Sequence, residues 1–242
     1  MTDKHPHLIR APKDRFTSGL MANMRFVAQR MVLKPVVWSI TTVSVRGHDA
    51  VKGVQGAFIA VANHSSHLDA PLIMCALPRR LGRYLAAGAA ADYFFDIWWR
   101  RILTALFFNA FPIDRTGTAE KRGVSKKLLG RGVPLLVFPE GTRSKTGEMA
   151  AFKPGAAALS ISCDVPCVPV AIIGASDAMP RGRNWPIPGR PPVAVVFGQP
   201  MLALAGETTE QFSNRIEREV RRLRSTGVAD GGSVQHPTKG LA

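Results

Sequence analysis

The apolar positions near the start of the chain recur with the period of a helix. From Thr17 to Leu33 apolar side chains return at three- and four-residue steps, and Arg25 and Arg30 interrupt them. This spacing places an apolar stripe on one face of an α-helix, with basic residues at its edges. The segment therefore predicts an amphipathic helix, which either packs on its own domain or lies in the interface of a membrane.

Beyond Pro35 the pattern changes to short apolar runs that alternate with helical stretches. The β-branched residues from Val36 to Val45 predict one or two strands. Further strands are predicted at residues 57–62, 84–86, 111–113, 134–138, 167–172 and 192–197. Helices are predicted at residues 70–77, 92–106, 118–131, 155–162 and 209–224. This alternation predicts an α/β fold with a central mixed, largely parallel sheet flanked by helices.

The same patterns divide the chain into four parts. Residues 1–15 are predicted to be a flexible arm, and residues 16–34 to be the amphipathic, membrane-facing helix. Residues 35–225 are predicted to form the α/β domain, followed by a disordered tail over residues 226–242. Charged residues interrupt every apolar stretch of about 18 residues, so no membrane-spanning helix is expected. No signal-peptide cleavage pattern follows the N-terminus.

Composition narrows the classes of protein and partner. The 242 residues are 46% hydrophobic and 20% charged, which supplies a sizeable core and excludes a disordered chain or a coiled coil. Lys and Arg total 32 against 17 Asp and Glu, a net charge of +15 that calls for an anionic partner. Aromatic residues make up only 7%, which is low for a platform that stacks nucleic-acid bases. The three cysteines lie in apolar runs and indicate reduced packing residues in a cytosolic compartment.

One candidate site lies where the run at residues 57–62 ends. His64 and Asp69 follow this strand, and Pro71 marks the first turn of the next helix. Asp69 is expected to be the helix N-cap, and its carboxylate can fold back onto one imidazole nitrogen of His64. That contact would fix the tautomer and leave the other nitrogen free to accept a proton. Alternatively, His64, His67 and Asp69 could ligate a metal, which would require a further ligand.

Two arginines lie at the carboxyl ends of later predicted strands. Arg115 follows the strand at 111–113, and Arg143 follows the strand at 134–138. A planar guanidinium matches phosphate oxygens, so two converging arginines predict a phosphate clamp. Next to Arg143, Gly141 allows close backbone approach to a ligand, and Glu140 could orient a substrate hydroxyl or an arginine.

The segments that contain His64 and Asp69, Arg115, and Arg143 are the first three of four sequence blocks. The fourth block, Val165–Val170, is an apolar strand that contains two prolines. Its residues Val168 and Pro169 are expected to line or support a pocket. Their alternative interpretation is ordinary hydrophobic core.

Together and in this order, the four blocks resemble the glycerolipid acyltransferase family, which includes bacterial 1-acyl-glycerol-3-phosphate acyltransferases. His64 and Asp69 match the family's Asn-His-x4-Asp pattern, and Arg115 matches its arginine block. The run Phe138–Ser144 reads Phe-Pro-Glu-Gly-Thr-Arg-Ser, which matches the third block outright. The resemblance spans roughly residues 45 to 200. One departure is that Asn109 stands where the second block usually opens with glycine.

The resemblance implies a specific reaction. His64, oriented by Asp69, would act as general base while a lysophosphatidate-like hydroxyl attacks an acyl thioester, in phospholipid synthesis. The acceptor's phosphate and glycerol would be held by Arg115, Glu140, Gly141, Thr142 and Arg143. The donor would be acyl-CoA or acyl-carrier protein, with no bound cofactor, no metal and no covalent acyl-enzyme. The protein is expected to act at an anionic membrane surface, on the cytoplasmic face of the cell membrane. It would be a peripheral or monotopic membrane protein.

Other functions remain open at this point. The acceptor could be a different lysophospholipid or another lipid alcohol. A metallohydrolase could use His64, His67 and Asp69. A nucleic-acid-binding protein would explain the net charge but not the four ordered blocks, so no nucleic-acid partner is expected.

Overall fold

A seven-stranded sheet forms the centre of the described part of the chain. The computed structural model describes residues 15–90, 106–113 and 119–229. The strand order is β1-β7-β6-β2-β5-β3-β4. In chain order these strands are β1 Thr42–Arg46, β2 Ile59–Ala62, β3 Ala86–Ala90, β4 Phe111–Ile113, β5 Leu135–Val137, β6 Cys167–Ile173 and β7 Pro192–Phe197. Strands β6, β2, β5, β3 and β4 are parallel, whereas β7 runs antiparallel to β6 and carries β1 parallel to itself. The expected mixed, largely parallel sheet is confirmed.

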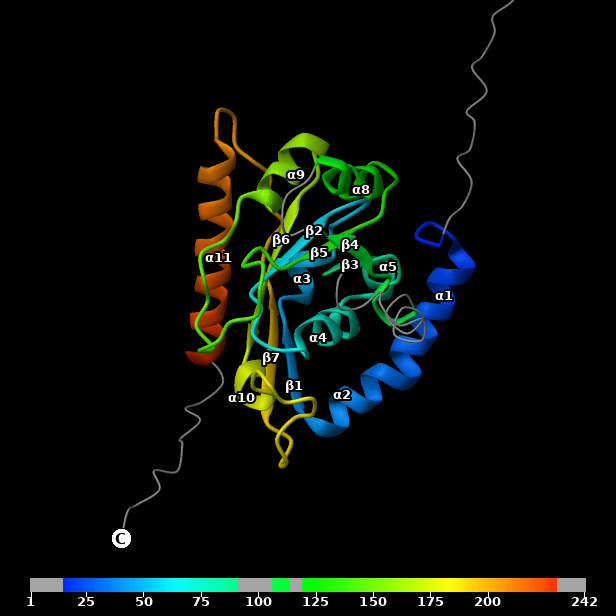
Figure 1. The fold of residues 1–242 in the computed structure, drawn as a ribbon, viewed down its shortest axis with the longest axis vertical. Helices are drawn as coiled ribbons and strands as arrows, with labels where there is room; N and C mark the ends of the chain where they lie inside the picture. The colour runs from blue at the N-terminus through cyan, green and yellow to red at the C-terminus, as the bar shows by residue number, and fades with distance from the viewer. Residues whose placement is uncertain (1–14, 91–105, 114–118, 230–242) are drawn as a thin grey trace, which may run out of the picture.

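Helices cover both faces of the sheet (Figure 1). One face packs against α2 (Lys34–Ile40) and α4 (Asp69–Ala76), and the other against α8 (Ala119–Gly130), α9 (Gly155–Cys163) and α11 (Thr209–Ala229). Along β2 the side chains alternate between the two faces, as the pleat of a strand requires. Ala60 and Ala62 point to the α4 side, while Ile59 and Val61 point to the α9 side.

The register of β2 explains where the site forms. Val61 of β2 lies opposite both Val137 of β5 and Pro169 of β6. The loops that leave β2 and β5 therefore emerge side by side at one edge of the parallel sheet, where ligand sites of α/β folds are found. These loops carry the first and third sequence blocks.

The N-terminal segment is one helical arm with three parts. Helix α1 (Gly19–Ala28) continues through a π-helical turn, η1 (Gln29–Leu33), into α2. The arm lies along the outside of the fold (Figure 1). The helix expected over residues 17–33 is therefore present, but it does not end there. None of the helices in the described part combines the length and apolar character that a bilayer crossing requires.

The prediction of strand from Val36 to Val45 was wrong in its first half. Residues 34–40 are helix α2, and β1 begins only at Thr42. Pro35 sits at the start of α2, where its missing N–H costs little. Val37 is buried in the core beside α4. Packing of the arm thus overrides the β propensity of these residues.

Other boundaries differ less. The strand expected at 84–86 begins later, as β3 over Ala86–Ala90. Three short helices were not predicted: α3 (His48–Val51), α5 (Arg79–Gly82) and α10 (Ala175–Ala178). The helix expected at 92–106 lies almost wholly outside the described residues. The same holds for most of the flexible arm expected over residues 1–15 and of the tail expected over residues 226–242.

Candidate active site

His64 and Asp69 face each other in the loop between β2 and α4. The imidazole Nδ1 lies 2.8 Å from Asp69 Oδ2. The Asp69 side chain is fully buried, whereas 22% of the His64 side chain is exposed. An ionised carboxylate only accepts hydrogen bonds, so Nδ1 carries the proton and Nε2 keeps its lone pair. The pair is therefore arranged to accept a proton at Nε2.

Asp69 is held by the loop that precedes it. Its Oδ2 atom also accepts the backbone N–H of Ser65 at 2.7 Å and of Ser66 at 2.8 Å. Asp69 is the first residue of α4, and Leu68 occupies the N-cap position, so the expected N-cap role for Asp69 was wrong. The carboxylate turns back to close the loop instead of bonding the helix N–H groups that follow it. This fold-back fixes the orientation of the imidazole.

The third block supports His64 from the other side. The Phe138 ring stacks on the imidazole, with centroids 4.1 Å apart and planes 17° apart. The His64 N–H donates to Glu140 Oε1 at 2.6 Å, and the Ser144 N–H donates to the His64 carbonyl at 2.8 Å. Both backbone polar groups of His64 are thus fixed by residues from the loop after β5.

Glu140 has a positioning role that its sequence interpretation did not include. The side chain is buried, and its second oxygen, Oε2, accepts the Ala150 N–H at 2.9 Å. Burial raises the pKa of Glu140, and the two backbone hydrogen bonds act in the opposite direction. Since each oxygen already accepts a backbone N–H, the carboxylate ties His64 to the loop over residues 144–150.

Two further polar residues fix the loop that carries His64, and the sequence alone did not predict their roles. The Asn63 Nδ2 donates to the Ile172 carbonyl at 2.9 Å, and the Ile172 N–H donates to Asn63 Oδ1 at 2.8 Å. The Ser66 hydroxyl donates to the Met179 carbonyl at 2.9 Å. Both residues stand in the first block, but their partners are more than 100 positions away, so only the fold reveals them.

Arg143 lies near this loop. The next residue, Ser144, donates its N–H to the His64 carbonyl. Partial desolvation lowers the pKa of His67, and the charge of Arg143 lowers it further. Arg143 itself is half-buried and Thr142 is exposed. Arg115 lies outside the described residues.

The sequence model of the Acyltransferase family matches residues 42–173. The chain belongs to this family. It is 28% identical to 1-acyl-sn-glycerol-3-phosphate acyltransferase alpha of Mus musculus over 209 residues, which cover 81% of this chain and 69% of that protein. It is 29% identical to a 1-acyl-sn-glycerol-3-phosphate acyltransferase of Chlamydomonas reinhardtii over 156 residues, which cover 63% of this chain and 45% of that protein. The chain thus spans about half to two thirds of the length of these relatives.

A solved structure shares the fold of this acyltransferase-family chain. The crystal structure of the 1-acyl-sn-glycerophosphate acyltransferase PlsC from Thermotoga maritima superposes with a TM-score of 0.63 at 25% identity. The match covers 89% of each chain. The similarity therefore extends beyond residues 42–173, the region that the family model matches.

The backbone conformation of Asn109 explains why it can stand where the family usually has glycine. Asn109 has a φ of +48°, in the left-handed region that glycine adopts most easily. Asparagine is one of the few other residues that enter this region routinely. Its Nδ2 donates to the Tyr84 carbonyl at 3.2 Å. Asn109 can therefore supply the backbone turn for which the family usually uses glycine.

The fourth block of the acyltransferase-family chain supports the sheet. Val168 is fully buried in the hydrophobic core, and Pro169 is buried opposite Val61. Val168 therefore does not line an accessible pocket, because the centre of a sheet with helices on both faces leaves it no access. Among the described residues, no group of three or more His, Cys, Asp or Glu side chains is arranged to hold a metal.

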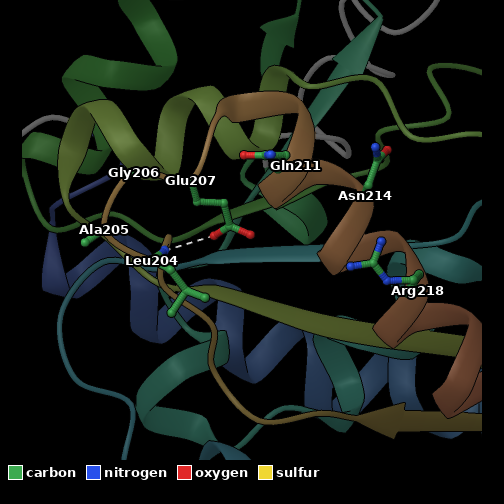
Figure 2. Close-up of a pocket in the computed structure, with 7 residues that line it drawn as sticks. All are labelled: Leu204, Ala205, Gly206, Glu207, Gln211, Asn214 and Arg218. Atoms are coloured by element: carbon green, nitrogen blue, oxygen red, sulfur yellow. Dashed lines mark hydrogen bonds between the residues drawn. The ribbon is translucent and has the colours of Figure 1, made fainter.

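A hollow of about 380 Å³ lies at the start of α11, and neither His64 nor Asp69 lines it. Figure 2 shows the residues that do. The Leu204 N–H donates to Glu207 Oε2 at 2.9 Å inside it. Arg215 donates to both Glu207 oxygens, at 2.6 and 2.7 Å. The carboxylate is therefore used to fix the turn before α11. No residue of the four blocks lines this hollow.

The backbone conformation at position 141 favours glycine. Its φ is +78°, and a Cβ atom there would lie 3.0 Å from Lys153 Nζ. Gly132 has a similar φ of +80° with nothing within 4 Å of such a Cβ, so it is a matched control. We expect Gly141→Ala and Gly132→Ala each to lower the free energy of unfolding by about 1–2 kcal/mol, measured by urea denaturation. Only Gly141→Ala should also reduce catalytic activity, and equal activity of the two variants would contradict a role for Gly141 in the site.

Proposed function

We propose that this protein is a 1-acyl-glycerol-3-phosphate acyltransferase of phospholipid synthesis. It transfers a fatty acyl group from a thioester to the free hydroxyl of a lysophosphatidate-like acceptor. The observation that carries the proposal is the buried Asp69 carboxylate bonded to His64 Nδ1, with Nε2 left as a proton acceptor. The named activity of several relatives and of the PlsC structure supports it.

The chemistry needs one proton transfer in each direction. His64 Nε2 removes the proton of the acceptor hydroxyl as its oxygen attacks the thioester carbonyl carbon. The carbon–sulfur bond then breaks, and the leaving thiolate takes the proton from the imidazolium. The Asp69 carboxylate stabilises the imidazolium between these steps. General base catalysis of this kind contributes about 10²–10⁴-fold. Because a thioester is already activated, the residues present suffice without a covalent acyl-enzyme.

The acceptor phosphate is proposed to bind Arg143 beside the Gly141–Thr142 backbone, with Arg115 as the second arginine of the clamp. Arg143→Ala is expected to raise the KM for lysophosphatidate about 10- to 100-fold, because charge-assisted hydrogen bonds contribute about 1.5–3 kcal/mol. The kcat should fall much less. Steady-state kinetics with varied acceptor measures both values. Lys145→Ala removes an exposed charge two positions away and is the matched control. An unchanged KM in Arg143→Ala would remove Arg143 from the clamp.

Donor and acceptor identity are tested together on the purified chain. Labelled acyl-CoA and acyl-carrier protein are each offered with lysophosphatidate, another lysophospholipid and a neutral monoacylglycerol. We expect transfer to lysophosphatidate to be the most efficient, and activity to survive treatment with a chelator. Preference for a neutral lipid alcohol would assign a different acceptor, and loss of activity that added metal restores would support a metallohydrolase.

The helical arm is proposed to hold the protein on the cytoplasmic face of the membrane, as a peripheral or monotopic protein. Large apolar side chains remain exposed along it: Leu20, Met21, Met24, Val27, Met31, Val32 and Val36. A contiguous exposed apolar face of this kind suits the boundary between headgroups and acyl chains. All three cysteines are free, as is typical of a reducing compartment. Vesicle flotation tests the proposal, and a chain that stays in solution with every lipid composition contradicts it.

A further inference from the structure

A second cavity lies between the helical arm and the carboxyl end of α4. Its volume is about 420 Å³. Part of its lining is apolar and comes from Val45 and the segment Cys75–Pro78. Four basic side chains also line it: Arg30, Lys34, Lys52 and Arg80. His64 and Asp69 lie at the other end of α4 and do not line it. The cavity is therefore separate from the catalytic pair.

The two arginines of this cavity donate hydrogen bonds to backbone carbonyl groups, which are neutral. The Arg30 Nη2 donates to the Leu77 carbonyl at 2.9 Å. Arg80 donates to the carbonyls of Val51 and Val54, at 3.0 and 2.5 Å. No described carboxylate pairs with either guanidinium, and none of the lining residues is acidic. Their positive charge is consequently available to a ligand.

Lys34 strengthens this local charge. It lies one helical turn beyond Arg30, and its Nζ is 4.9 Å from the centre of the Trp38 ring. Desolvation lowers the pKa of Lys34, and the charge of Arg30 lowers it further. Lys52, which also lines the cavity, is paired with Asp49. Two neighbouring cations beside a partly apolar cavity repel each other, and an anion placed between them would relieve that repulsion.

The π-helical turn η1 sets this part of the arm. The Lys34 N–H donates to the Gln29 carbonyl across the wider π turn. The buried Gln29 side chain donates to the Phe107 carbonyl at 2.6 Å, and the Cys75 thiol donates to the Gln29 carbonyl at 3.8 Å. Single π turns recur at functional sites. Here Arg30 lies within the turn and Lys34 directly follows it, and the contacts of Gln29 with Phe107 and Cys75 hold the turn in place.

The surroundings of the cavity indicate the class of ligand. Met31, Val32 and Val36, which are exposed, belong to the same stretch of the arm as Arg30 and Lys34. A phospholipid can place its phosphate among the cations and its acyl chains along these residues. A free phosphate or a soluble nucleotide would leave the apolar side chains in water.

We propose that this cavity binds the phosphate group of an anionic phospholipid in the membrane, as a second lipid site apart from the catalytic one. Binding there does not depend on the acyl transfer reaction. If the proposed function holds, its product belongs to the same class of lipid.

The test compares binding of the full chain to phosphatidylcholine vesicles with and without phosphatidylglycerol. The double variant Arg30→Gln/Lys34→Gln is expected to bind the anionic vesicles about 30-fold more weakly, on the scale of membrane attraction per basic residue. Its binding to pure phosphatidylcholine should not change. Lys126→Gln/Lys127→Gln removes the same charge from the exposed surface of α8 and is the matched control. Equal losses in both double variants would overturn the site, because they would show a general charge effect only.

Further variants keep the experiment decisive. Lys34→Met leaves the Arg30 hydrogen bond in place, so it reports on the site if the double variant fails to fold. Met31→Ser should weaken binding to both kinds of vesicle alike. Thermal unfolding with inorganic phosphate alone tests the other source of the same chemistry. Stabilisation of the native chain by phosphate, lost in Lys34→Met, with no preference for anionic vesicles, would overturn the lipid assignment. Every readout is independent of turnover, so an inactive chain does not affect the result.

Discussion

His64→Ala is expected to lower kcat for acyl transfer by about 10²–10⁴-fold and to leave the protein folded. The variant removes the only group in the described site that the geometry prepares to accept the hydroxyl proton. The side chain is partly exposed, so its removal leaves no large cavity in the core. Its stacking contact with Phe138 is lost, while its backbone bonds to Glu140 and Ser144 remain. Single-turnover transfer from a labelled thioester, together with thermal unfolding, measures both effects.

His67→Ala is the matched control for this experiment. His67 lies in the same loop, three residues later, and its ring is exposed. It has no described contact with Asp69 that would make it a proton acceptor. We expect this variant to keep most of the activity, which would also argue against a metal site built from both histidines. Full activity of a folded His64→Ala variant would refute the mechanism.

The sequence was most informative where a short run of residues determines both structure and chemistry. The first and third blocks predicted the loops after β2 and β5, and the parallel arrangement of these strands brings the loops together. The His64–Asp69 contact could be predicted because both partners lie within one turn between a strand and a helix. The strand at Phe111–Ile113 was also placed correctly. Pro112 lies inside it, which the sheet tolerates because β4 is an edge strand.

Contacts across long sequence separations could not be predicted in this way. Glu140 bonds the His64 backbone, and Asn63 bonds Ile172, only because the sheet brings these residues together. A buried carboxylate that fixes backbone and one that binds substrate have the same sequence signature. The helix from Lys34 to Ile40 was missed for a related reason, since burial of Val37 against the core outweighs the local preference of β-branched residues.

These contacts hold the loop that carries His64 at several points. His64 is fixed through its N–H, its carbonyl, its Nδ1 and its ring face by four different residues. Ser66 and Asn63 attach the same loop to the chain that follows β6 and to β6 itself. A loop held in this way positions Nε2 before the substrate arrives, which reduces the reorganisation needed during the reaction.

Asp69→Asn is the second substitution for which we expect a large effect, a loss in kcat of about 10³–10⁴-fold. The amide has nearly the volume of the carboxylate but no charge to stabilise the imidazolium. The corresponding change behind the catalytic histidine of a hydrolase triad costs about 10⁴-fold in kcat. The amide oxygen can still accept the N–H groups of Ser65 and Ser66. The free energy of unfolding should therefore fall much less than the activity does.

Asp69→Ala separates the structural part of this role from the chemical part. It leaves the Ser65 and Ser66 N–H groups buried without an acceptor, and each such loss costs about 1–3 kcal/mol. Urea denaturation should thus show a destabilisation of about 2–6 kcal/mol in Asp69→Ala, well above that of Asp69→Asn. Asp177→Asn, at an exposed carboxylate on α10, is the control and should change neither quantity. If Asp69→Asn kept the native kcat, the carboxylate would serve only to close the loop, and the charge behind His64 would have no part in proton transfer.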